Sequence, residues 1–172
     1  MKKYFILICI SKLLVTSSSA QYFTKITSDP LATLSGDSRS VNWMDFNNDG
    51  FSDCFISNGP AGGQNNMLFI NNGSGGFNLS TTDTITKDNK PSDGATAADY
   101  NNEGNVDCFV VNWYNANNLL YLNSGSGSFN FIASGLQSND GGYSETASWG
   151  DYDSDGFVDL YVMNYVLEME TG

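Results

Sequence analysis

The 172-residue sequence has no histidine, and it contains only three cysteines and three prolines. Without an imidazole the chain can build neither a Ser-His-Asp triad nor a histidine-ligated zinc site, and it lacks the commonest general base. The chain itself is therefore not expected to be an enzyme. Cys54 and Cys108 occupy the same position of an internal repeat, so we expect two small buried apolar residues rather than a disulfide.

Basic residues are also scarce, with seven lysines and arginines against 19 acidic residues. A protein that binds nucleic acid needs positive charge to displace the counterions of the phosphate backbone. An anionic membrane surface likewise attracts basic segments, and none is present. Nucleic acid and membrane surfaces are therefore excluded as partners, whereas a cation remains a possible one.

Long hydrophobic runs are absent except at the N-terminus. Lys2 and Lys3 precede a mostly apolar run over residues 4–15, and the small residues Ser18, Ser19 and Ala20 follow it. This order is typical of a secretory signal peptide, and the run is too short to span a bilayer. We predict a signal peptide over residues 1–20 and a secreted mature chain over 21–172 without membrane insertion. An uncleaved anchor and an ordinary helix are the alternatives.

Acidic residues gather in a motif that occurs three times. It stands at 45–53 as DFNNDGFSD, at 99–107 as DYNNEGNVD and at 151–159 as DYDSDGFVD. The repeats are 54 and 52 residues apart, and they hold ten of the 19 acidic residues. A solubilising surface would spread its charge, so this placement indicates a repeated cation-binding loop.

The flanks of the motif repeat as well. Alternating apolar runs follow each loop (DCFISN, DCFVVN, DLYVMN), and LFINNGSGGF at 68–77 matches LYLNSGSGSF at 120–129. Alternation with period two, broken by Asn-Gly and Ser-Gly, indicates strands and hairpins. Four strands in about fifty residues are the signature of a propeller blade. The predicted fold is all-β, a β-propeller-type array of four-stranded antiparallel blades, with about three blades present after a signal-peptide helix.

The loop pattern matches calcium chemistry. Calcium binds six to eight oxygens at about 2.3–2.6 Å, and short oxygen-bearing side chains on alternate residues of a tight loop can supply them. We predict ligands from side chains at positions 1, 3, 5 and 9 and from the carbonyl at position 7. These are Asp45, Asn47, Asp49, Phe51 and Asp53 in loop 1; Asp99, Asn101, Glu103, Asn105 and Asp107 in loop 2; and Asp151, Asp153, Asp155, Phe157 and Asp159 in loop 3.

The helical EF-hand does not fit these loops, because it needs a bidentate Glu at position 12, which here is Ile56, Val110 or Val162. The remaining alternative is a metal-free turn in which Asp and Asn side chains bond only their own backbone. Up to three structural calcium ions are expected. Loop 3 should bind best with its four aspartates, and loop 2 least well, because Glu103 carries an extra methylene.

Aromatic residues form two groups. Trp113 and Tyr114 lie in the variable linker between second and third strands, and they are candidates either for a partner contact or for covering a local core. Others recur at equivalent repeat positions, where packing between blades is expected rather than a ligand platform. These are Phe55, Phe109 and Tyr161 in one set, and Phe77 and Phe129 in another.

The patterns WMDFNNDGFSDCFISN, AADYNNEGNVDCFVVN and SWGDYDSDGFVDLYVMN, with their Gly-rich hairpins, resemble the FG-GAP or VCBS repeats of integrin alpha heads and cartilage acidic protein. The resemblance covers about residues 36–165. It implies blades of a β-propeller, commonly seven, with calcium between the first two strands of each blade. Seven blades need far more residues than this chain has, so we expect an N-terminal piece of a longer protein.

The resemblance implies an exported calcium-binding module for adhesion or for binding an extracellular protein or glycan, at the cell surface or secreted. A propeller part of a larger secreted hydrolase or lyase is the second possibility, and a structural spacer is the third.

Overall fold

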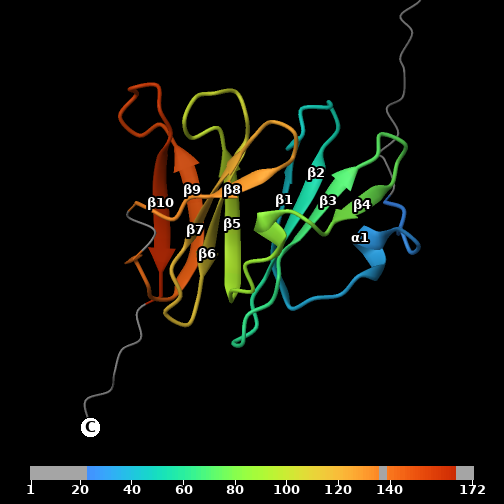
Figure 1. Ribbon diagram of the computed structural model, residues 1–172, viewed down its shortest axis with the longest axis horizontal. Helices are drawn as coiled ribbons and strands as arrows, with labels where there is room; N and C mark the ends of the chain where they lie inside the picture. The colour runs from blue at the N-terminus through green and yellow to red at the C-terminus, as the bar shows by residue number, and fades with distance from the viewer. Residues whose placement is uncertain (1–22, 136–138, 166–172) are drawn as a thin grey trace, which may run out of the picture.

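The structure is a computed structural model that describes residues 23–135 and 139–165, so the predicted signal peptide lies outside the described residues. Figure 1 shows three antiparallel sheets side by side in a row. The first contains β1 (Ser38–Met44), β2 (Asp53–Asn58), β3 (Met67–Asn71) and β4 (Phe77–Ser80); the second contains β5 (Ser92–Ala98), β6 (Asp107–Asn112), β7 (Leu119–Asn123) and β8 (Phe129–Phe131); the third contains β9 (Ser144–Gly150) and β10 (Asp159–Asn164).

The four-stranded sheets follow chain order, β1-β2-β3-β4 and β5-β6-β7-β8, and every neighbouring pair is antiparallel. The register repeats as well, because the last residue of each first strand pairs with position 9 of its loop: Met44 with Asp53, Ala98 with Asp107 and Gly150 with Asp159. The predicted all-β array is therefore confirmed as two complete blades and two strands of a third.

Two short helices that were not predicted from the sequence precede the four-stranded sheets along the chain, one before β1 and one between β4 and β5. They are α1 (Pro30–Thr33) and the 3₁₀ helix η1 (Thr84–Thr86). Asp29 and Asp83 cap them by accepting the N–H groups of Leu31 and Ile85, and the same carboxylates accept the first N–H of β4 and of β8. The sequence Asp29-Pro30 was a readable helix-start signal. Among the described residues, no helix is long and apolar enough to cross a membrane.

The core lies between the sheets rather than inside any one of them. One cluster joins the first two sheets and includes Phe55, Val110 and Phe129, and a second joins the second and third sheets around Phe109. Repeated aromatic positions therefore do pack between blades, as predicted. There are two exceptions: Tyr161 is 72% exposed, and Phe77 belongs to neither cluster and meets Trp43 of its own sheet edge-on. Both predicted apolar thiols, Cys54 and Cys108, are buried and free.

A buried network of amides holds the strand ends opposite the loops. The Asn66 carbonyl oxygen accepts the N–H of Asn58 at 2.9 Å, and its amide donates to Asp88 and Ser92. The network recurs one blade later. There its members are Asn112, Asn118, Asp140 and Ser144. This network was not predicted from the sequence, although the Asn-Asn pairs at 65–66 and 117–118 mark it.

Candidate metal-binding loops

All three acidic loops lie along one edge of the row of sheets, at the top of Figure 1, because each connects the first and second strands of its sheet at the same end of the strands. Adjacent loops contact each other. The side-chain amide of Asn48 in loop 1 donates to Asn105 Oδ1 in loop 2 at 3.0 Å, and the amide of Asn102 in loop 2 donates to the Gly156 carbonyl in loop 3 at 2.9 Å. The loops therefore form one continuous edge.

The three loops share one backbone conformation. Position 4 is left-handed in each, with φ of 58° at Asn48, 58° at Asn102 and 62° at Ser154, and the glycine at position 6 has φ of 89°, 92° and 91°. A Cβ added to any of these glycines would meet nothing within 4 Å, so it is the backbone angle that calls for glycine. The repeated motif thus encodes a repeated turn.

The carboxylate at position 1 organises each loop from within. Asp45 accepts the N–H of Asp49 with Oδ1 at 3.1 Å and the N–H of Gly50 with Oδ2 at 2.8 Å. Asp99 and Asp151 make the same pair of bonds in their loops. Such bonds occur in a metal-free turn and in a calcium loop alike, so the separation of the oxygens is the informative quantity.

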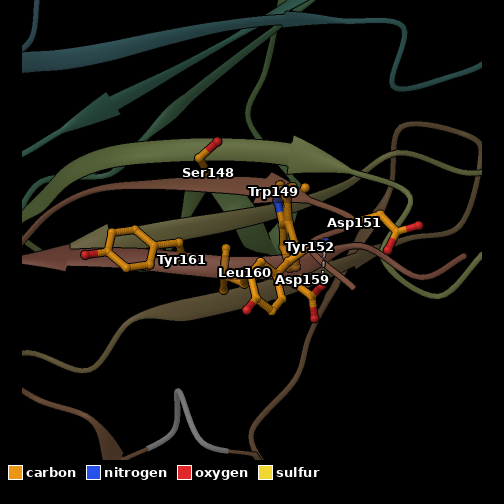
Figure 2. A pocket seen from close by; sticks show the side chains of 8 residues that line it. Ser148, Trp149, Asp151, Tyr152, Asp159, Leu160 and Tyr161 are labelled. Carbon is orange, nitrogen blue, oxygen red and sulfur yellow. Dashed lines mark hydrogen bonds between the residues drawn. The ribbon is translucent and has the colours of Figure 1, made fainter. Parts of the chain in front are cut away.

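Loop 3 brings together three of its four predicted carboxylate ligands, and the fourth, Asp155, is not part of the group. Asp151, Asp153 and Asp159 each offer an oxygen, and the three oxygens lie within 4.8 Å of one another on exposed side chains. Two ligands on opposite sides of a calcium ion are about 5 Å apart, since each lies about 2.3–2.6 Å from it. The donor set and its spacing therefore fit calcium. Figure 2 shows Asp151 and Asp159 at the loop end of the β9–β10 pair, beside Trp149 and Leu160.

Position 9 has an additional structural role in the first two loops. Asp53 is fully buried; one of its oxygens accepts the N–H of Phe46 at the start of the loop, and the other accepts the N–H of Asn71 at the end of β3. Asp107 repeats this arrangement. Burial raises the pKa of both carboxyls. An oxygen that accepts one N–H still has a lone pair for an ion, so the role of position 9 as a calcium ligand stays a prediction.

Loop 2 differs from its neighbours at position 5. In loops 1 and 3 the N–H of the position-7 residue, Phe51 or Phe157, donates to the aspartate at position 5. No hydrogen bond of this kind joins Asn105 to the longer Glu103 within the described chain. The expectation that loop 2 binds calcium least well stays a prediction, and so do the carbonyl ligands at position 7.

The two linker aromatics belong to a local cluster. Trp113 stacks on Tyr165 at 6.3 Å between ring centroids and meets Tyr114 and Tyr143 edge-on. Its indole nitrogen is buried without a hydrogen-bond partner, and Tyr114 is 45% exposed. The structure thus places Trp113 in a local aromatic cluster, and a partner contact through Tyr114 stays a prediction.

The chain matches a family of known repeats. A family model for the FG-GAP-like repeat matches residues 45–110 and again residues 99–162, and each match starts at the first residue of an acidic loop. No curated protein matches the chain significantly. Repeats of this kind are generally β-propeller modules involved in binding, and they occur in extracellular or surface proteins. Because the two matches together span more than half of its residues, the chain belongs to the FG-GAP-like repeat family.

Proposed function

We propose that the chain is an exported, calcium-stabilised β-propeller-type binding module in which calcium holds the loops and performs no chemistry. The observation that carries the proposal is the convergence of the carboxylates of Asp151, Asp153 and Asp159 to within 4.8 Å. Three negative charges so close together repel one another, and a divalent cation among them turns that repulsion into attraction.

The residues that would hold an ion are the predicted oxygen donors of each loop. Calcium would lie where the first two strands of each blade are joined. There it would link side chains that are up to eight residues apart in the sequence. Because Asn48 and Asn102 bond each loop to the next, ordering one loop favours order in its neighbour. The result is a stiff edge that can present a binding surface to an extracellular protein or glycan. The alternative of a propeller part of a larger secreted enzyme stays a prediction.

Thermal unfolding of the purified chain in chelator and in millimolar calcium tests the proposal. A ligand that binds only the folded state at about 100 times its Kd stabilises it by about 2.7 kcal/mol, so calcium should raise the Tm by several degrees. Millimolar calcium is the appropriate range because extracellular sites are often weak.

A pair of variants makes the test specific. Asp153→Ala should reduce the rise in Tm because it removes one of the converging carboxylates. Asp37→Ala removes an exposed carboxylate that only pairs with Arg39, at 3.4 Å, and should leave the calcium effect intact. Identical melting curves of the parent chain with and without calcium would refute the proposal.

A further inference from the structure

The first and third sheets stand at the two ends of the row of sheets (Figure 1), and each turns an apolar face outward. In β1 the side chains of Asn42 and Met44 face the second sheet, because the Asn42 amide donates to the Ala95 carbonyl at 3.1 Å and Met44 packs against the first core cluster. Side chains alternate along a strand, so Val41 and Trp43 point the other way. They are 54% and 49% exposed, and they form the apolar face of the first sheet.

The opposite end of the row carries a second apolar pair. Leu160 and Val162 of β10 pack in the second core cluster, against the second sheet. Tyr161 and Met163 alternate with them and point away from that sheet, where they are 72% and 50% exposed. No described strand covers this face. Single exposed apolar residues are ordinary, but two pairs on two opposite faces indicate surfaces that suit a partner.

The contact between the second and third sheets shows how two such faces fit together. Trp149 stands two residues before loop 3 and Phe109 two residues after the end of loop 2, and their rings meet edge-on at 6.2 Å between centroids. Trp43 likewise stands two residues before loop 1, and Tyr161 two residues after the end of loop 3. The two end faces therefore carry the two halves of a contact that the chain already makes internally.

Charge also favours a second copy of the chain at the ends of the row. Arg39, Asp93 and Glu145 occupy one repeat position, 54 and 52 residues apart. Burial and the charge of Glu145 raise the pKa of Asp93, whereas Arg39 lowers it, so each member acts on its neighbour in the next sheet. Beyond Glu145 the next member would be Arg39 of another copy. That neighbour brings opposite charges together, where the chain itself sets Glu145 beside Asp93.

The edge formed by the acidic loops extends in the same direction. At position 4, Asn48 of loop 1 donates to loop 2, and Asn102 of loop 2 donates to loop 3. Ser154 holds position 4 of loop 3 with the same left-handed backbone, and no further loop follows it among the described residues. A copy stacked on the third sheet would place its loop 1 there and continue the edge.

We propose that copies of this chain associate head to tail, with the outward face of the third sheet of one copy packed on the outward face of the first sheet of the next. Tyr161 of one copy then lies against Trp43 of the other, as Phe109 lies against Trp149, and Glu145 lies near Arg39. The contact joins two different faces, so it is heterologous and extends into a ring or a filament. The proposal goes beyond the calcium function and does not rest on it, because neither face contains a predicted ligand.

Sedimentation velocity of the purified mature chain (residues 21–172) at about 2–200 µM, in calcium and in chelator, tests the association. With a Kd of about 10 µM or tighter, the average mass should rise with concentration to at least that of a dimer. A monomer at about 200 µM in both conditions would overturn the proposal. Association of a chain whose Tm does not respond to calcium would support this proposal and refute only the calcium one.

A mixing experiment tests the head-to-tail geometry. Trp43→Glu and Tyr161→Glu each place a charge on one end face, so each variant alone should associate at least about tenfold more weakly than the parent chain. Mixed together, each variant supplies the face that the other lacks, and they should form a dimer that contains one copy of each. Association of either variant alone at the parent's strength, or the absence of a dimer from the mixture, would overturn the proposed pairing of the two faces.

A second set of variants leaves the aromatic packing intact. Arg39→Glu places a like charge beside Glu145 of the next copy and should weaken association about fivefold; adding Glu145→Arg to the same chain should restore it. Phe131→Gln is the control, because it removes a ring that is 46% exposed but lies on the second sheet, and it should leave association unchanged. Failure of the double variant to recover would contradict the predicted neighbours, as would weakened association in the control.

Discussion

The second and third sheets carry the same loop in different surroundings. Ser154 and Gly156 of loop 3 have the same left-handed angles as their counterparts in loop 2. In contrast, Asp107 is fully buried whereas Asp159 is exposed, and Phe109 is 2% exposed whereas Tyr161 is 72% exposed. The third sheet has no described strand in the place that β7 takes in the second. The turn is thus set locally by its own residues, and burial of position 9 depends on the third strand.

The largest effect that separates these two regions is expected from alanine at position 9. Asp107→Ala leaves the partly buried N–H of Tyr100 and the buried N–H of Asn123 without an acceptor and should lower the free energy of unfolding by about 3 kcal/mol. Asp159→Ala loses one exposed bond, from the N–H of Tyr152, and in chelator should change stability by less than about 1 kcal/mol.

Urea unfolding of both variants in chelator measures this difference without a contribution from calcium. Asp53→Ala is the matched control, because its carboxylate joins the same two elements in the first blade. The loss of unfolding free energy in Asp53→Ala should resemble the loss in Asp107→Ala. Equal losses for Asp107→Ala and Asp159→Ala would contradict the view that the third strand gives position 9 its structural role.

The comparison of the repeated sheets also shows which features of the structure could be predicted from the sequence. Four strands per repeat, the loops between first and second strands, and packing of Phe55 and Phe109 between sheets were all predictable, because each depends on local periodicity that occurs more than once. The matching register of β1–β2 and β5–β6 confirms this. Repetition separates a structural pattern from chance in a way that a single motif cannot.

What could not be predicted depends on contacts between distant segments. The two bonds from Asp53 to Phe46 and Asn71 require knowledge of where β3 ends in space. A cavity beside Asp88 requires that a linker fold back onto β7 and β8. Neither feature follows from the residues of one segment, and the aspartate that ends each motif, such as Asp53, is the first residue of the following strand.

An exchange at position 5 sharpens the comparison between loops 2 and 3. Asp155→Glu gives loop 3 the longer side chain of loop 2 and removes the acceptor of the Phe157 N–H, so calcium affinity should fall about tenfold. Glu103→Asp makes the reverse change and should strengthen binding in loop 2. Calcium titration followed by calorimetry measures both, and an unchanged affinity in both variants would show that position 5 does not control binding.

A smaller effect is expected from pH at the linker that follows η1. Burial raises the pKa of Asp88 to about 6, from a model-peptide value of 3.8, against the opposing effect of its bond from Tyr121. The folded state then holds this proton more tightly than the unfolded state, so the contribution of Asp88 to stability falls as pH rises from about 4 to 6. The other titratable groups around Asp88 are Lys87, Lys90 and Tyr121, which line one cavity with it. Cys108 and Asp83 lie near Tyr121.

Asp88→Asn removes this titration while keeping the shape of the side chain. The variant should be more stable than the parent chain by roughly 1 kcal/mol near neutral pH, and this gain should disappear near pH 4. Urea unfolding of the variant and the parent chain in chelator, from near pH 4 to near neutral pH, measures the difference in stability at each pH. A difference between variant and parent that is independent of pH would rule out Asp88 as the titrating group.

The smallest expected effect concerns the contact between loops 2 and 3. Among the described residues, the Asn102 amide donates to the Gly156 carbonyl alone, whereas the Asn48 amide donates both to Asn105 and, at 3.4 Å, to the Gly125 carbonyl. Asn102→Ala should therefore lower stability by about 0.5 kcal/mol, since the bond is exposed. If the bond couples the loops, the variant should also weaken calcium binding to loop 3 without altering any of its ligands. Loop 3 affinity that is unchanged while stability falls would show that neighbouring loops bind independently.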